Sequence, residues 1–187
     1  MDSPSIEQNS ASYILLSGSH AATEAIFPII ARLSTESKIM VLDCGNRFNV
    51  FPLAREIRKI TPKVTTSLKN ISIARAFTCY QVVALLSSLA ILPDYAIVLD
   101  LLSTFYDENV PVVERKRLLL ESIVHLRRLS VPSPVLVTTK PLASVREPAR
   151  VELENILLSS AGASYQIQKP ELKAADITPL WPTMGIG

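Results

Sequence analysis

The sequence predicts an α/β protein in which a mostly parallel central sheet is covered by helices on both faces, giving three layers. Three observations support this fold class. Short apolar runs alternate with longer segments in which apolar residues recur at helical spacing. The apolar runs are nearly continuous, as is typical of strands buried on both faces. Prolines fall between these segments, where the chain has to turn.

Each expected element follows from this pattern. Strands are predicted at residues 13–17, 38–43, 71–74, 95–100, 135–139 and 164–168, and helices at residues 20–34, 50–60, 78–92, 112–129 and 149–160. Pro28 should kink or shorten the first helix, because proline lacks the amide hydrogen that a helix interior needs. Pro148 is expected in the first turn of the last helix. The clearest helix is 112–129, whose predicted buried face contains Leu118, Leu119, Ile123, Leu126 and Leu129 and whose more exposed positions include Glu114, Arg117, Glu121 and Arg128.

A chain of 187 residues has the size of one domain with a single core. We expect a flexible N-terminal segment at 1–12, the core at 13–169, and a C-terminal arm at 170–187 in which Trp181 is the one candidate anchor. Hydrophobic residues make up 48% of the chain. This high fraction fits either a surface that a partner covers or a sheet that is buried on both faces.

Charge and cysteine content restrict the class of protein. The formal net charge of +2 gives no strong overall field, so any binding to nucleic acid must come from a local patch. Two cysteines are too few for a disulfide framework, which predicts a reducing compartment. The first residues are polar, and the longest apolar run, 82–92, is shorter than the roughly 20 residues that cross a bilayer. We therefore expect no membrane association, and a nuclear location in a eukaryote or a cytoplasmic one otherwise.

Residues 13–25, YILLSGSHAATEA, occupy the place of a phosphate-binding loop after the first strand. The motif G-x-x-x-x-G-K-[ST] needs a second glycine, a lysine for the phosphates and a hydroxyl for magnesium. Counted from Gly18, these positions hold Thr23, Glu24 and Ala25. A glutamate in place of the lysine repels a triphosphate by about 1 to 4 kcal/mol. The sequence therefore predicts a vestigial nucleotide site, with no catalytic residue, no bound cofactor and no metal.

Later segments carry a resemblance to a known family. They are VLDCGNRFNVFPLAREI after the second strand, IARAFTCYQVVALL at the third, YAIVLDLLSTFYDE at the fourth, and VLVTTK before a basic loop. In this order they resemble the ATPase core of the RecA-type recombinases, especially the eukaryotic and archaeal recombinases and their paralogues. The matching positions are Asp43, Phe48, Ala74, Arg75, Ala76, Phe77, Gln81 and Asp100. The resemblance covers about residues 13–168 and implies a RecA-like fold.

The departures from this family are equally informative. The resemblance implies a catalytic glutamate two residues after Asp43, but that position is Gly45. Lysine, magnesium hydroxyl and water-positioning acid are thus all replaced, which predicts a degenerate ATPase. The remaining carboxylate, Asp100, holds magnesium poorly without a phosphate to supply other ligands. For Asp100 and Asp43 the favoured interpretation is a strand-terminal residue that accepts backbone hydrogen bonds.

The resemblance also implies two loops that face DNA. The loop after the fifth strand, KPLASVREPAR, contains Lys140, Arg146 and Arg150, which predict salt-dependent contacts with phosphates unless the loop is simply solvated. In the loop after Asp100, Phe105 and Tyr106 are interpreted as packing residues rather than as a base-stacking pair. The basic run Arg115 to Arg117 is interpreted as a solvated helix face.

Together these features predict a non-catalytic RecA-like subunit of a homologous-recombination complex, in the manner of the minimal recombinase paralogues of Shu-type complexes. Such a protein pairs with another RecA-like paralogue, in a heterodimer or a larger complex, assists the main recombinase and contacts DNA through its basic loop. Two alternatives stay open at this point. One is an atypical ATPase that binds nucleotide through backbone amides alone. The other is a regulatory assembly module of the same fold without nucleic-acid binding.

Overall fold

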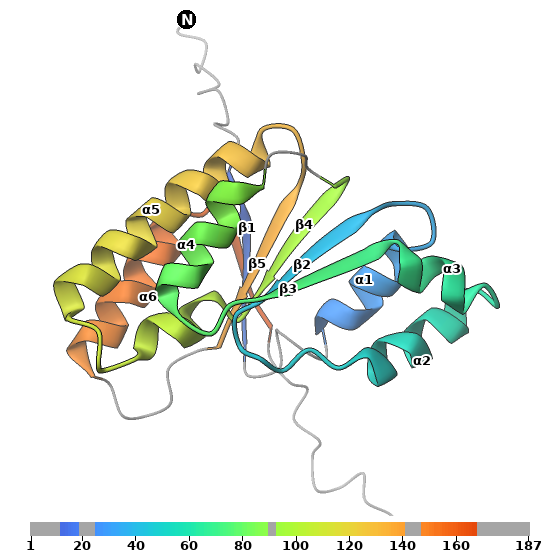
Figure 1. The fold of residues 1–187 in the computed structure, drawn as a ribbon, viewed down its shortest axis with the longest axis horizontal. Coiled ribbons are helices and arrows are strands. Elements are labelled where there is room, and N and C mark those ends of the chain that lie inside the picture. Colours follow the sequence, from blue (N-terminus) through green and yellow to red (C-terminus); the bar gives the residue numbers. More distant parts are fainter. Residues whose placement is uncertain (1–11, 19–24, 90–92, 141–146, 168–187) are drawn as a thin grey trace, which may run out of the picture.

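A single parallel sheet organises the protein (Figure 1). The computed structural model describes residues 12–18, 25–89, 93–140 and 147–167. Its six strands have the spatial order β3-β2-β4-β5-β1-β6, and all neighbouring pairs are parallel. The strands are β1 (Ile14–Ser17), β2 (Ile39–Asp43), β3 (Ile71–Arg75), β4 (Tyr95–Leu99), β5 (Val135–Thr139) and β6 (Ala163–Gln166).

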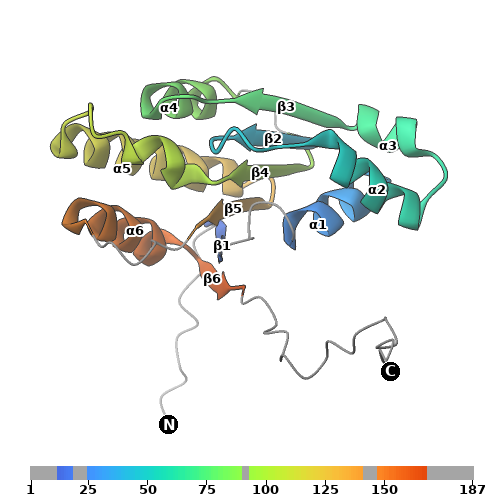
Figure 2. The same ribbon diagram turned by 90° about the horizontal axis from the view of Figure 1, so that it is seen from below.

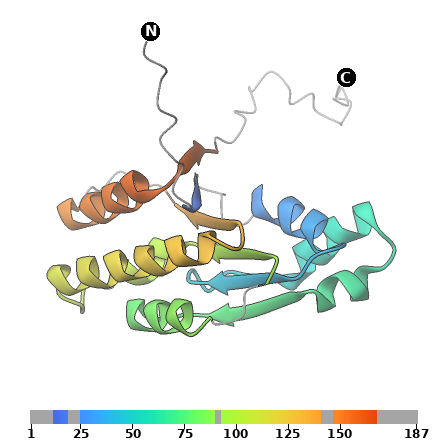
Figure 3. The same ribbon diagram turned by 90° about the horizontal axis from the view of Figure 1, so that it is seen from above.

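Helices cover both faces of this sheet, which confirms the predicted three-layer α/β architecture of a RecA-like core (Figures 2 and 3). One layer contains α1 (Ile26–Leu33), α2 (Val50–Ile60) and α3 (Val64–Lys69). The other contains α4 (Cys79–Ser88), α5 (Val112–Ser130), α6 (Pro148–Ser160) and the short 3-10 helix η2 (Leu101–Tyr106). Each layer encloses its own apolar cluster, represented by Ile30 and Ile57 on the first side and by Leu119 and Leu157 on the second.

The path of the chain fixes where a ligand site can form. The connection from β1 through α1 and those from β2 to β3 run over one face, whereas the connections after β3, β4 and β5 run over the other. Three neighbouring strand pairs, β3 with β2, β2 with β4 and β5 with β1, therefore send their helices to opposite faces. Ligands of open α/β sheets bind at such points, outside the carboxyl ends of the strands.

Local contacts explain where the helices begin. The Asn49 side chain accepts a hydrogen bond from the Phe51 amide and caps α2. At α4, the Thr78 hydroxyl accepts from the Gln81 amide while the Gln81 side chain accepts from the Phe77 amide. This reciprocal pair resembles a capping box. The segment ARAFTCYQ, which carries the family resemblance, thus includes the start signal of α4.

Some predicted boundaries were wrong. The helix predicted for 78–92 ends at Ser88, and Leu89 is already extended, while residues 90–92 lie outside the described part of the chain. Neither α3 nor η2 was predicted, because each spans only six residues and is too short to show a helical period. Pro148 lies in the first turn of α6, as expected.

Other predictions fall wholly or partly outside the described residues. They are the start of the first helix at 20–24, most of the N-terminal segment 1–12, and the C-terminal arm 170–187 with Trp181. Pro28 lies in the first turn of α1 as described, where its missing amide hydrogen leaves no helical bond unmade. Among the helices that the structure describes, none is both long and apolar enough to span a bilayer.

Candidate functional site

Four residues named in the sequence analysis lie at the carboxyl ends of four strands: Gly18 and Asp100 of the predicted vestigial nucleotide site, the acidic residue Asp43, and the predicted DNA contact Lys140. Gly18 follows β1, Asp43 ends β2, Asp100 follows β4 and Lys140 follows β5. Because β2, β4, β5 and β1 are neighbours in the sheet, these residues share one edge. The strand pairs whose connecting helices diverge meet at this same edge. The structure therefore brings the predicted residues together where an α/β ligand site is expected.

Position 18 needs a glycine because its backbone packs closely against the chain that follows β6. Its amide donates to the carbonyl of Thr139 at 3.2 Å, and the Ile167 amide donates to the carbonyl of Ser17 at 2.7 Å. A Cβ atom on residue 18 would lie 2.5 Å from the Ile167 carbonyl oxygen, closer than real contacts allow. This glycine therefore has a structural reason that does not involve phosphate. Of the other predicted loop positions, Ala25 lies just before α1, half-buried, while Thr23 and Glu24 lie outside the described residues.

Asp100 is a buried carboxylate with a cationic partner. Its backbone is left-handed, with φ of 56°, and its amide donates to the hydroxyl of Thr138 at 2.9 Å. Its Oδ2 atom lies 3.1 Å from Nζ of Lys140, and the two side chains are 7% and 31% exposed, respectively. A buried charge is costly unless it is paired. The ion pair with Lys140 therefore offsets part of the cost of burying the Asp100 carboxylate.

Gly45 lies directly against this ion pair. A Cβ atom on residue 45 would come within 2.8 Å of both Cβ and Oδ2 of Asp100. Any side chain at this position must displace the Asp100 carboxylate and with it the contact to Lys140. The position at which the family resemblance implies a catalytic glutamate therefore has no room for one while Asp100 keeps its observed conformation.

Asp43 has a structural role, as the sequence interpretation favoured. It is 1% exposed, and its carboxylate accepts hydrogen bonds from the amides of Arg47 and Phe48 at 3.2 and 3.0 Å. The Arg75 guanidinium lies 3.4 Å from Oδ2 of Asp43 and also donates to the carbonyl of Phe48 at 3.1 Å. Arg75, a residue of the ARAFTCYQ segment, thus ties β3 to the turn that follows β2.

Cys44 lies between the two acidic strand ends and is buried. Burial is the main cause that raises the pKa of its thiol, and the negative charges of Asp43 and Asp100 raise it further. The thiol therefore stays protonated near neutral pH and does not act as a nucleophile there. Among the described residues, no group of three or more His, Cys, Asp or Glu side chains is arranged to hold a metal ion.

The basic loop after β5 has fewer available charges than its sequence indicates. Lys140 pairs with Asp100. Arg150 pairs with Glu147 at 2.9 Å and Glu108 at 3.3 Å. The Arg150 guanidinium also lies 5.0 Å from the ring centroid of Tyr106, a cation–π contact. Arg146 lies outside the described residues.

The two described cations of the loop, Lys140 and Arg150, are thus paired with three carboxylates. Lys140 and Arg150 are each about one-third exposed, so each can still reach solvent. A phosphate that binds either residue must compete with an internal partner. Lys140 lies at the carboxyl edge of the sheet, directly after β5, and Arg150 lies at the start of α6. The described cations of the loop are therefore at its two ends.

Two interpretations of other side chains have different outcomes. Phe105 is fully buried and Tyr106 contributes to the core beneath α6, which agrees with their interpretation as packing residues. The interpretation of Arg115 as solvated was wrong, because its side chain is only 3% exposed and its Nε and Nη1 atoms have no hydrogen-bond partner in the described part of the chain. Lys116 and Arg117 beside it are more exposed, because they lie on the outer side of α5.

Sequence reasoning did not find the contact between Asp100 and Lys140. Both residues were named, but as a magnesium ligand position and a DNA contact. The available signal was that each follows an apolar strand, because the carboxyl ends of parallel strands share an edge. This signal predicts a contact between the two side chains only once β4 and β5 are known to be neighbours in the sheet.

Comparisons with known proteins give no independent identification of this site. A scan against models of protein families finds none that matches the sequence, and a search of curated proteins finds no match either.

Proposed function

We propose that this protein is a RecA-like subunit without ATP turnover, which pairs with another RecA-like chain and assists the main recombinase in DNA repair by homologous recombination. The observation that carries the proposal is the ion pair between Asp100 and Lys140, with Gly45 packed against it. Internal contacts fill the edge of the sheet where magnesium and a water-positioning acid are needed for phosphoryl transfer. The site supports a structural use of the fold better than a catalytic one.

Each missing part of the reaction has a distinct physical consequence. Magnesium can bind Asp100 only after the carboxylate releases Lys140. Among the described residues, the neighbouring carboxylate, Asp43, is already used by backbone amides and Arg75. A general base cannot be accommodated at Gly45. Glu24 replaces the cation that would bind the terminal phosphates. These differences all disfavour turnover.

The free edge of β3 supports a role in docking another chain. Among the described residues, β3 pairs only with β2, so its outer backbone groups have no strand partner there (Figure 2). Ile73, Phe77 and Tyr80 on and just after this strand are 45%, 62% and 49% exposed. An exposed apolar edge strand is a template for an added strand from another protein. We therefore place the RecA-like partner at this edge.

Affinity purification of the tagged protein tests the partner. We expect a RecA-like paralogue to co-purify with the wild-type chain and to be lost from a variant carrying Ile73→Asp and Phe77→Asp. Phe51→Asp is the matched control, because Phe51 is 79% exposed and lies on α2 rather than on β3 or α4. Equal recovery of the paralogue by all three proteins would refute docking at β3. Recovery of only non-recombinase proteins would favour the regulatory module.

Contact with DNA is the second part of the proposal, through Lys140, Arg146 and Arg150. We expect replacement of all three by glutamate to abolish DNA binding by the assembled complex. Because Lys140 also neutralises Asp100, a variant with only Arg146→Glu and Arg150→Glu separates loss of contact from loss of folding. An unchanged affinity with an unchanged salt dependence would show that this loop does not bind DNA.

One observation favours the alternative of an atypical ATPase. Lys140 places a cation at the nucleotide edge, where it is able to take over the role of the missing lysine if Asp100 releases it. Steady-state measurement of phosphate release distinguishes the two functions. The subunit proposal predicts no turnover above background by wild-type protein, and turnover that Lys140→Met removes would establish the alternative.

A further inference from the structure

The charges of this protein are divided unevenly between the two sides of the sheet. Residues 25–75, which contain the helical layer of α1, α2 and α3 together with β2 and β3, have nine cationic and three anionic side chains, a net charge of +6. The other described residues have seven cationic and nine anionic side chains, a net charge of −2. The small charge of the whole chain therefore conceals one strongly basic helical layer (Figure 2).

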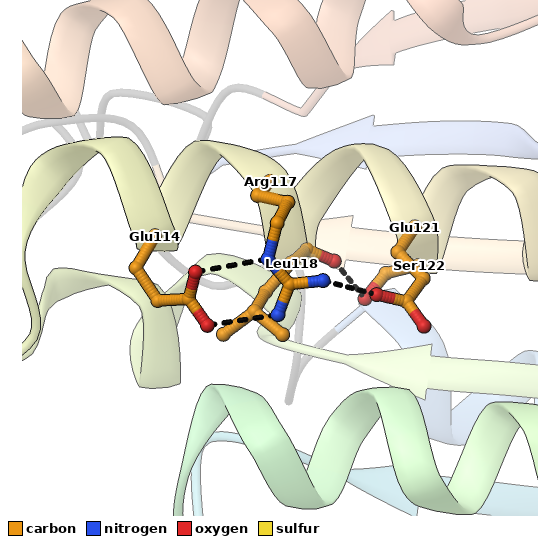
Figure 4. Close-up of polar contacts among 5 residues, drawn as sticks. All are labelled: Glu114, Arg117, Leu118, Glu121 and Ser122. Atoms are coloured by element: carbon orange, nitrogen blue, oxygen red, sulfur yellow. Dashed lines mark hydrogen bonds and ion pairs between the residues drawn. The ribbon is translucent and has the colours of Figure 1, made fainter.

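The cations on the opposite side of the sheet are used by contacts within the protein. Arg117 of α5 is typical, because it donates to Glu114 and to Glu121 at 2.8 to 2.9 Å (Figure 4). The others pair with carboxylates, donate to backbone carbonyls or are buried: Arg115, Lys116, Arg127, Arg128, Lys140 and Arg150. A cation held in this way has to leave its partner before it can bind a ligand.

The basic layer differs in this respect. Within residues 25–75 only Lys59 and Arg75 form ion pairs, with Glu56 and Asp43 respectively. The remaining cations of this segment are exposed and form no ion pair with any carboxylate of the described part of the chain: Arg32, Lys38, Arg47, Arg55, Arg58, Lys63 and Lys69. Unpaired exposed cations attract anions without first losing an internal contact.

Helix α2 combines two of these cations with an exposed aromatic ring. Phe51, Arg55 and Arg58 are separated by four and three residues, so they lie along one side of the helix. Leu53 and Ile57, on the opposite side, are buried in the core. Phe51 is 79% exposed, the largest exposed aromatic surface among the described residues. We call Phe51, Arg55 and Arg58 the α2 face.

We propose that the α2 face binds single-stranded nucleic acid, with Arg55 and Arg58 on phosphate groups and Phe51 stacked on a base. A guanidinium group binds phosphate oxygens through two parallel hydrogen bonds. An aromatic ring stacks on any base, so a face of this kind binds without regard to sequence. Arg47 just before α2 and Lys63 just after it are exposed as well and extend the basic surface at both ends of the helix.

The arrangement of α2 favours nucleic acid over an anionic membrane. A helix that lies on a membrane inserts a broad apolar side, but the apolar side of α2 is already buried in the core. The other exposed apolar residues of the helix, Val50 and Ile60, lie at its two ends and do not share the side of Arg55 and Arg58. A single ring beside cations instead matches a strand in which phosphates alternate with unpaired bases. In a duplex the faces of the bases are covered, and Phe51 would have nothing to stack on.

Fluorescence anisotropy of a labelled oligodeoxynucleotide with the purified full chain tests this inference. We expect sequence-independent binding in the micromolar range, tighter for a single strand than for a duplex of the same length. Each phosphate contact contributes about 0.7 to the slope of log affinity against log salt, so a variant with Arg55→Gln and Arg58→Gln should bind more weakly with a slope smaller by about 1.4. The matched control is Lys116→Gln with Arg117→Gln, which removes the same two charges from cations that already have carboxylate partners and should keep the wild-type slope.

Replacement of Phe51 tests the stacking contact separately. Phe51→Leu keeps an apolar side chain but removes the ring, so it should weaken binding of the single strand about fivefold or more and leave binding of the duplex unchanged. No binding by wild-type protein, or an equal loss in the α2 variant and its control, would overturn the proposal. Binding to vesicles of phosphatidylserine and phosphatidylcholine without binding to the oligonucleotide would assign the surface to lipid and overturn it too.

The α2 face consists of other residues than the loop after β5 and the free edge of β3, so the inference does not rest on the proposed function. If Arg146→Glu with Arg150→Glu abolished binding of the oligonucleotide while the α2 variant bound normally, this inference would be wrong and the DNA-binding loop would stand. Phe51→Asp should retain the partner at β3 and still weaken binding of the oligonucleotide. The two surfaces can therefore fail independently.

Discussion

Replacing Lys140 by methionine measures how much the ion pair between Asp100 and Lys140 contributes to the free energy of unfolding. Methionine keeps most of the side-chain length but removes the charge that faces Asp100. Unit charges 3.1 Å apart attract by about 5 kcal/mol at an effective dielectric of 20 and by about 1 kcal/mol in water. Because Lys140 is 31% exposed, part of this attraction is screened. We expect the free energy of unfolding to fall by about 1 to 3 kcal/mol, less than for a fully buried pair.

A double-mutant cycle isolates this interaction. Unfolding by urea is followed by far-ultraviolet circular dichroism for wild type, Lys140→Met, Asp100→Asn and the double variant. A coupling energy of about 1 to 3 kcal/mol is expected, and each kcal/mol corresponds to roughly 2 to 4 °C in midpoint for a chain of this size.

Lys116→Met is the matched control for this cycle. Lys116 is 30% exposed, like Lys140, but its partner Glu152 is 52% exposed rather than buried. An exposed pair of this kind contributes about 0 to 1 kcal/mol. If Lys140→Met cost no more than Lys116→Met, or if the coupling with Asp100→Asn were absent, the nucleotide edge would not be held closed by this ion pair.

Three further predictions follow from the same structure. Gly45→Glu should destabilise the fold by about 1 to 3 kcal/mol and restore no ATP hydrolysis, because its Cβ would lie 2.8 Å from Asp100; stable, active protein would contradict this. Gly18→Ala should destabilise by a similar amount in urea unfolding, because the contact with the Ile167 carbonyl at 2.5 Å involves backbone that cannot move aside cheaply; an unchanged midpoint would contradict it. Burial raises the pKa of Cys44 and Tyr13 above their ordinary values of 9.0 and 10.0, so the folded state retains these protons more tightly. That stability is fully present below about pH 9 and is lost as the pH rises through the folded-state pKa values. Tyr13→Phe should therefore make the alkaline loss of stability less steep, besides costing about 1 kcal/mol at neutral pH through loss of the 2.6 Å hydrogen bond to Leu157; identical pH profiles would refute the assignment.

The fold was predictable because its central strands are apolar on both faces. Runs such as residues 135–139 have few polar positions, and this pattern identifies strands between two helical layers. The apolar face of α5 was likewise correct through Leu118, Ile123 and Leu129. The short elements α3 and η2 could not be predicted, because six residues contain fewer than two helical turns.

The candidate site was predictable in position but not in its contacts. Strand-end residues such as Asp43 and Asp100 were expected at the carboxyl edge. Lys140 can pair with Asp100 because β4 lies beside β5, and this strand order does not follow from the sequence pattern. Arg115 shows the same limit. Its place in a basic run predicted an exposed side chain, but on α5 this position faces the protein interior, and Arg115 is buried.

We propose that the carboxyl edge of the sheet, where Lys140 pairs with Asp100, no longer binds nucleotide. Thermal unfolding of the purified chain with increasing ATP and magnesium tests this most directly, because a ligand at one hundred times its dissociation constant stabilises a protein by about 2.7 kcal/mol. We predict that the midpoint stays unchanged up to millimolar ATP. A saturable rise in midpoint that requires magnesium and disappears in Asp100→Asn would contradict the account.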